Sequence, residues 1–141
     1  MRITDALRGE HAAMRPLIRS IREQTRPGTK VGKDLVTCYA NGIKTTIIAH
    51  TTVEEPFLFF QLKNEPAVKH ALMEHKQIDD LLTKAIETGD QATLHKATRL
   101  IIGHFAEEEQ DVFPLAEKKL CAVKLSQLGA GWAEARGIKL A

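Results

Sequence analysis

Four long stretches of this chain carry apolar residues at the three- and four-residue spacing of an α-helix. Short breaks separate the stretches, which cover about residues 4–24, 33–63, 66–88 and 90–118. Short connections between long amphipathic helices favour neighbours that run antiparallel. We therefore predict an all-α fold, an up-down-up-down four-helix bundle over about residues 4–120. A short, weakly helical tail is expected over 121–141, and the whole chain, 1–141, is expected to form a single domain.

Local signals predict where these helices begin and end. Pro66 suits the first turn of the third helix, because its missing N–H has no partner there. Gly89 suits the position just after a helix, and Asp90 suits the N-cap of the next one. Pro56 and Pro114 fall inside the second and fourth helices, where each removes a backbone donor. We expect a kink near both prolines.

Polar residues interrupt the apolar stripes at positions where a structural core would have leucine. Each helix has one histidine in its stripe, and the second and fourth helices also have a glutamate: His11, His50, Glu54, His75, His104 and Glu108. Left unpaired in a core, such groups cost about 1 to 3 kcal/mol each. A bound metal removes that cost, so we interpret these six residues as candidate metal ligands.

The same polar pattern occurs twice along the chain. Residues 10–18 and 74–82 share Glu-His followed by apolar residues, whereas 50–59 and 104–113 share His-x-x-x-Glu-Glu. Residues four apart lie on one helix face with Cβ atoms about 5 to 6 Å apart, so an imidazole and a carboxylate can reach one ion. Two such pairs supply two carboxylates to bridge a dinuclear centre, and the four imidazoles divide two to each ion. Nitrogen and carboxylate ligands with open positions suit iron, and less often manganese or zinc.

The height of each candidate ligand follows from its distance to the nearest turn, at about 1.5 Å per residue. His75 lies 14 residues before Gly89, and His104 lies 14 residues after Asp90. The numbers of residues between the candidate ligands and the other two connections are also similar on the two sides of each connection. All six candidate ligands therefore fall near one height, as a single site requires.

Other polar residues are predicted to lie outside this site. His70 and His95 fall off the apolar stripes and are expected at the surface. Glu55, Glu107 and Glu109 flank the candidate ligands, and solvent is the expected place for them. The alternative is that they orient a ligand imidazole.

Charge, hydropathy and cysteine usage exclude several classes of protein. A net charge of +2 is too small for a nucleic-acid binder, and the arginines of the first helix are interpreted as a solvated flank. No apolar run approaches the roughly 18 residues that cross a bilayer, and no signal-peptide pattern is present. We therefore expect no membrane association and a cytoplasmic location. Cys38 and Cys121 form no C-x-x-C pair and are expected to be buried or half-buried thiols.

The sequence resembles the hemerythrin family, in particular the bacterial branch called the HHE cation-binding domain. The resemblance runs from Ile3 to about Leu128 and is most specific in EHAAMRPLI, HTTVEEPFLFF, EHKQIDDLL and HFAEEEQDVFPL. It implies an up-down four-helix bundle with two iron ions, joined by an oxo or hydroxo bridge. It also places the ligand role on His11, His50, Glu54, His75, His104 and Glu108.

Two departures from the oxygen-carrying members of that family bear on function. Those proteins have a second histidine four residues after the one in the third helix, where this chain has Asp79. Their last bridging carboxylate is an aspartate five residues after its histidine, whereas Glu108 follows His104 by four. Four imidazoles instead of five argue against a stable, reversible oxygen carrier. Asp79 either completes the metal shell or faces solvent.

Three functions are compatible with these residues. The first is a binder of a small ligand, O₂, NO or peroxide, that serves as a store, sensor or scavenger. The second is a di-iron enzyme, or an iron-donating repair protein, that acts in oxidative or nitrosative stress. The third is an interaction module without metal chemistry, whose histidines respond to pH. The first two share all their residues, so the sequence leaves enzyme and binder open.

Overall fold

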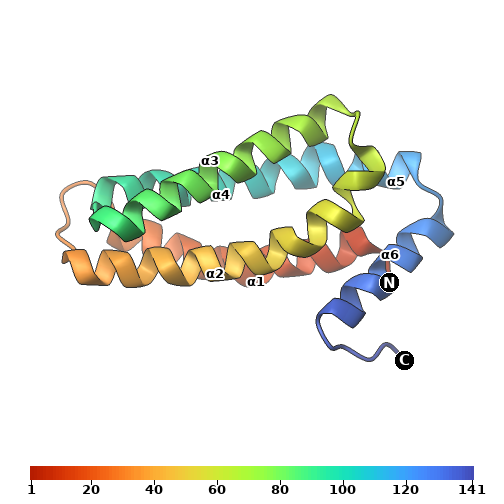
Figure 1. The fold of residues 1–141 in the computed structure, drawn as a ribbon, viewed down its shortest axis with the longest axis horizontal. Helices are drawn as coiled ribbons and strands as arrows, with labels where there is room; N and C mark the ends of the chain where they lie inside the picture. Colours follow the sequence, from red (N-terminus) through yellow and green to blue (C-terminus); the bar gives the residue numbers. More distant parts are fainter.

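The computed structural model describes residues 1–141 and contains helices and turns but no strand, so the predicted all-α helical bundle is confirmed. Four long helices lie side by side (Figure 1): α1 (Ile3–Gln24), α2 (Lys33–Phe57), α3 (Pro66–Thr88) and α4 (Gln91–Glu107). Their connections lie at alternating ends of the bundle in this view. None of the helices combines the length and the apolar character needed to span a membrane.

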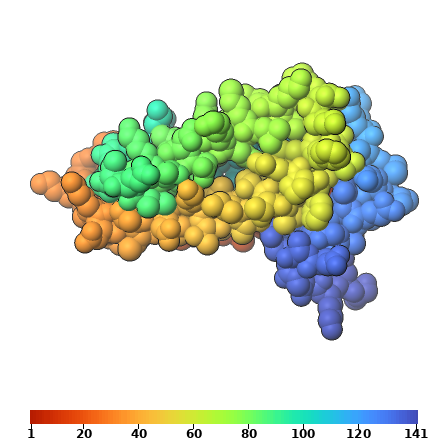
Figure 2. Space-filling view, in the orientation of Figure 1, coloured from red at the N-terminus to blue at the C-terminus, as the bar shows by residue number.

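Four shorter elements complete the fold: the 3₁₀ turn η1 (Phe59–Leu62), the π-helical turn η2 (Glu108–Val112), α5 (Phe113–Lys119) and α6 (Ala122–Ala135). α6 packs mainly against α1 and also contacts α2. Figure 2 shows the residues of α6, in dark blue, standing out from the side of the bundle near one end. The predicted short tail helix is therefore present, and the glycines inside it do not make it weakly helical. Gly129 lies inside α6, where a Cβ would come within 2.3 Å of the Met1 carbonyl oxygen, so a glycine is needed for the close packing on the N-terminus.

The apolar core forms two clusters of buried side chains. One is built around Met14, Ile43, Ile78, Leu94 and Ile101. The other is built around Leu7, Leu58, Phe59, Val68 and Phe113. Along the chain, each predicted ligand histidine lies near the point where residues of one cluster give way to residues of the other. The candidate ligands are thus enclosed by apolar side chains on both sides along the bundle.

The predicted signals at the helix ends are present. Pro66 is the first residue of α3, and Gly89 adopts a left-handed conformation with φ of 62°. The N–H of Gly89 donates to the carbonyl of Ala85, which closes the last turn of α3. Asp90 then caps α4, because its carboxylate accepts a hydrogen bond of 2.9 Å from the backbone N–H of Thr93.

One helix ends earlier than the apolar pattern predicted, and another reaches its predicted end but changes its hydrogen-bonding pattern on the way. α2 ends at Phe57 instead of near residue 63, one residue after Pro56, and η1 follows. α4 gives way to the π-helical turn, in which the N–H of Phe113 donates to the carbonyl of Glu108, five residues back. Pro114, the next residue, has no N–H and so cannot continue the bonding pattern. The backbone pattern therefore changes near both prolines, and the second change begins at a candidate ligand.

The expectation of buried or half-buried thiols is wrong, since Cys38 and Cys121 are both exposed and unpaired. Cys38 lies on the outer face of α2, and Cys121 is the N-cap residue of α6, where the chain turns at the surface. Apolar periodicity can assign Cys121 to a buried helix face only if the helix continues through this residue. The helical pattern breaks just before Cys121, so the prediction fails there.

Candidate metal centre

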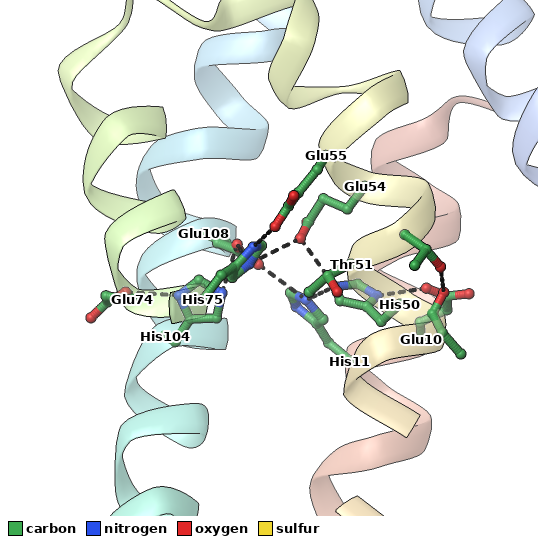
Figure 3. A network of polar contacts seen from close by, with 12 residues as sticks. Glu10, His11, His50, Thr51, Glu54, Glu55, Glu74, His75, His104 and Glu108 are labelled. Carbon is green, nitrogen blue, oxygen red and sulfur yellow. Dashed lines mark hydrogen bonds and ion pairs between the residues drawn. The ribbon is translucent and has the colours of Figure 1, made fainter. Parts of the chain in front are cut away.

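All six predicted ligand side chains meet in one buried cluster between the four long helices (Figure 3). α1 supplies His11, α2 supplies His50 and Glu54, α3 supplies His75, α4 supplies His104, and Glu108 is the first residue of η2. The most exposed member of the set, His75, is only 8% exposed. The heights counted along the helices thus correspond to a real convergence in space.

The two buried carboxylates lie between the imidazoles. Glu54 Oε2 lies 3.4 Å from Nε2 of His50 and 3.4 Å from Nε2 of His75. Glu108 Oε1 lies 2.8 Å from Nε2 of His104 and 3.4 Å from Nε2 of His75. Its Oε2 lies 3.2 Å from Nε2 of His11. Each carboxylate therefore contacts histidines of both helix hairpins, which is the placement that bridging two ions requires.

The other nitrogen of each imidazole, Nδ1, contacts its own glutamate on the outside of the cluster. The four pairs are His50 with Glu10 at 2.6 Å, His104 with Glu74 at 2.7 Å, His75 with Glu55 at 2.7 Å and His11 with Glu109 at 3.0 Å. An ionised carboxylate can only accept, so each Nδ1–H donates. When such a ring is neutral, the lone pair of Nε2 faces the centre, as it does in metal-binding histidines.

The donor set fits a metal cation. Both carboxylate oxygens of Glu54 and of Glu108, and Nε2 of His75 and of His104, are buried without a hydrogen-bond partner. His104 and Glu108 approach to 2.8 Å, but their atoms lack the angles of a hydrogen bond. Nε2 of His11 and Nε2 of His50 face each other at 3.1 Å, which sets two lone pairs against one another when both rings are neutral. A positive ion among these atoms would satisfy all of them.

The pKa values of the clustered groups also indicate a site that favours a cation. Burial alone would lower the pKa of these histidines, but the carboxylates around them outweigh it. They raise the pKa of His50 to about 10, of His75 to about 11 and of His104 to about 9. Burial would raise the pKa of Glu54 and Glu108, yet the neighbouring imidazoles hold both below the usual value, Glu108 well below it. The carboxylates thus favour positive charge at their centre, and a metal ion would compete with protons for these histidines.

Aromatic rings fix the orientation of two of the imidazoles. Phe105 stacks on His11 with ring centroids 4.0 Å apart, and Phe59 stacks on His75 at 5.4 Å. Both phenylalanines are buried, so they also exclude water from this part of the cluster.

The sequence pattern revealed only part of the outer ring of carboxylates. Glu55 and Glu109 each contact an imidazole, as the alternative to a solvated position requires. Glu107 does not join them and instead lies 3.2 Å from exposed His70. Glu10 and Glu74 also belong to this outer ring, and the repeated Glu-His pair is the sequence signal that marks them. Each of these two contacts the histidine of the following helix and not its own neighbour in sequence.

The remaining residues in question lie away from the cluster. His70 is 51% exposed, as expected. His95 is partly buried, and its Nδ1 lies 3.1 Å from the carbonyl oxygen of Arg22. Asp79 is 55% exposed, with Lys44 at 3.5 Å, so the solvent-facing alternative applies.

A helical bundle that encloses a buried cluster of histidines and glutamates defines this chain as a metal-binding helical protein. The family model described as the hemerythrin HHE cation-binding domain matches residues 2–116. The chain belongs to this family. No curated protein and no solved structure matched it. The matched range contains all six clustered residues, whereas α6 lies outside it.

Proposed function

We propose that this chain binds two iron ions through His11, His50, Glu54, His75, His104 and Glu108, with manganese or zinc as possible substitutes. The observation that carries the proposal is the set of buried, unpartnered carboxylate oxygens and imidazole nitrogens at the centre of the bundle. Nitrogen and carboxylate donors together suit iron.

The grouping of the donor atoms supports two ions instead of one. One donor from each of His11, His50, Glu54 and Glu108 lies within 4.8 Å of the others, and so does one from each of His75, His104 and Glu108. Glu108 belongs to both groups, and Glu54 also contacts His75 of the second group. This grouping supports an assignment in which two histidines serve each ion and the two carboxylates are shared.

We further propose that the centre interacts with a small ligand, O₂, NO or peroxide, for binding, sensing or detoxification. When bound, a di-iron centre with six protein ligands supplies open coordination positions and redox chemistry. The chain's own contribution is to orient the imidazoles through their outer glutamates and to exclude bulk water with Phe59 and Phe105. These buried surroundings favour a ligand of a few atoms.

Rapid mixing tests this function. Protein loaded with Fe(II) under anaerobic conditions is mixed separately with O₂, NO and peroxide, and its absorption spectrum is followed with time. We expect at least one of them to change the iron spectrum, with a long-lived product for a binder and repeated turnover for an enzyme or scavenger. Unchanged spectra with all three compounds would contradict the proposal.

A further inference from the structure

The tail helix reaches the candidate metal centre through one carboxylate. Glu10 Oε2 accepts a hydrogen bond of 2.6 Å from Nδ1 of His50, and Figure 3 shows Glu10 on the outer side of that ring. The other oxygen, Oε1, accepts from Nε1 of Trp132 at 2.9 Å and from Nε of Arg136 at 2.7 Å. Trp132 lies in α6, and Arg136 is its C-cap residue. A single carboxylate thus joins α6 to a candidate ligand.

The other three outer glutamates have no such link to the tail. Glu109 pairs with Arg15 of α1 at 2.7 Å. Glu74 has exposed His70 3.6 Å away, and Glu55 is 43% exposed. Among the four histidines, therefore, His50 alone has a partner that is held by residues from outside the four long helices.

Arg136 makes a second contact that fixes its own position. One of its terminal nitrogens donates a hydrogen bond of 2.6 Å to the carbonyl oxygen of Ala49, the residue before His50 in α2. A cavity of about 200 Å³ lies beside this contact, lined in part by Met14, Thr46 and Ala49. His50, Glu10 and Arg136 also line it, so the side chains have room to change conformation if these bonds are lost.

We propose that α6 is a positioning element for the metal centre: Trp132 and Arg136 fix Glu10, and Glu10 fixes the His50 ring with Nε2 toward the centre. An unrestrained glutamate has several rotamers to choose from, so holding its second oxygen reduces the freedom of the first. Where metal binding is concerned, the inference rests on the proposed function. Hydrogen bonds to the outer nitrogen of ligand histidines typically change metal affinity 10- to 100-fold.

The first test measures metal release from Trp132→Phe and Arg136→Gln, with exposed Gln127→Ala of α6 as the control. Fe(II)-loaded proteins are mixed with a chelator, and both iron ions are followed. We expect one ion to leave about 10-fold faster in the two variants and no change in the control. In a Glu10→Gln background, Trp132→Phe should add no further effect, because its target is already altered. Faster release that persists undiminished in that background would overturn the proposal.

A second test needs no metal and separates the inference from the proposed function. The Nδ1 proton of His50 is followed by NMR in the metal-free protein, and its exchange with water is measured. We expect faster exchange in Trp132→Phe and in Arg136→Gln, and less of an increase in Arg136→Lys, which keeps a donor. Equal exchange in all proteins would exclude the positioning role even if iron binds. If the wild-type chain binds no iron, the proposed function fails, but this measurement still decides the role of α6.

Discussion

At the scale of single residues, the candidate centre depends on which nitrogen of each imidazole faces inward. The same arrangement occurs four times, with Nδ1 on an outer glutamate and Nε2 toward the centre. Because the outer carboxylate holds the proton on Nδ1, Nε2 is free to bind a cation. The outer glutamates should therefore matter for metal affinity although none of them belongs to the central cluster.

Two glutamates that both lie close to exposed His70 give a matched test of this role. Glu74→Gln replaces the acceptor of His104, whereas Glu107→Gln alters a residue that contacts no imidazole of the central cluster. We expect the first variant to bind Fe(II) about 10- to 100-fold more weakly, because a neutral amide supports the ring less well. The second should bind like the wild type. Calorimetric titration under anaerobic conditions measures both, and equal affinities would contradict the role of Glu74.

Removing a proposed ligand should have a larger effect than removing another histidine. We expect His104→Ala and Glu54→Ala to lower the iron content per chain sharply, because each removes a donor from the buried cluster. His70→Ala and His95→Ala should leave the iron content unchanged, since both residues lie outside it. Metal analysis of the four purified variants checks this. Equal iron loading across the set would show that the ligand assignment is wrong.

At the scale of elements, the helix ends illustrate what periodicity predicts and what it misses. Pro66, Gly89 and Asp90 each favour a helix end through the properties of the residue itself. The helix ends predicted at these residues are confirmed. The end of α2 and the π-helical turn after α4 depend on hydrogen bonds redistributed around Pro56 and Pro114, which an apolar pattern does not record. The glycines inside α6 do not break it, because Gly129 allows close packing on Met1 and Gly131 faces the ring of Phe57.

The turn between α3 and α4 offers a prediction on stability. In Gly89→Ala the new Cβ would lie 2.8 Å from Cβ of Lys33, in a backbone conformation with φ of 62°. We expect a loss of at least about 1 to 2 kcal/mol in the free energy of unfolding, from the left-handed conformation alone. Gly42→Ala is the matched control, because it lies in α2 with open space around it and should stabilise the protein by up to about 1 kcal/mol. Urea unfolding measures both, and a Gly89→Ala protein as stable as wild type would contradict the account of this turn.

At the scale of the whole molecule, the bundle consists of two apolar clusters with a polar one between them. The polar residues in the stripes and their common height were predictable from the sequence, since both follow from position along a helix. Which outer glutamate meets which histidine was not, because Glu10 and Glu74 reach across to another helix. The contact of Arg136 with Glu10 joins residues 126 positions apart and likewise needs the folded chain.

This organisation predicts that metal stabilises the entire fold. The native chain gathers the six donors, whereas the unfolded chain disperses them, so an ion binds mainly the native state. At a free metal concentration 100 times the dissociation constant, one site adds about 2.7 kcal/mol to the free energy of unfolding. We expect the thermal midpoint to rise on anaerobic addition of Fe(II) and to fall again with a chelator. The expected rise should be much smaller in His104→Ala, and an unchanged midpoint in the wild type would count against metal binding.

Anomalous X-ray diffraction from crystals of the iron-loaded protein, recorded at the iron absorption edge, would locate the ions themselves. We expect two anomalous peaks per chain inside the bundle, one beside Nε2 of His11 and His50 and the other beside Nε2 of His75 and His104, with Glu54 and Glu108 between them. Peaks only at the surface, or none at all in protein shown to be folded, would contradict this expectation.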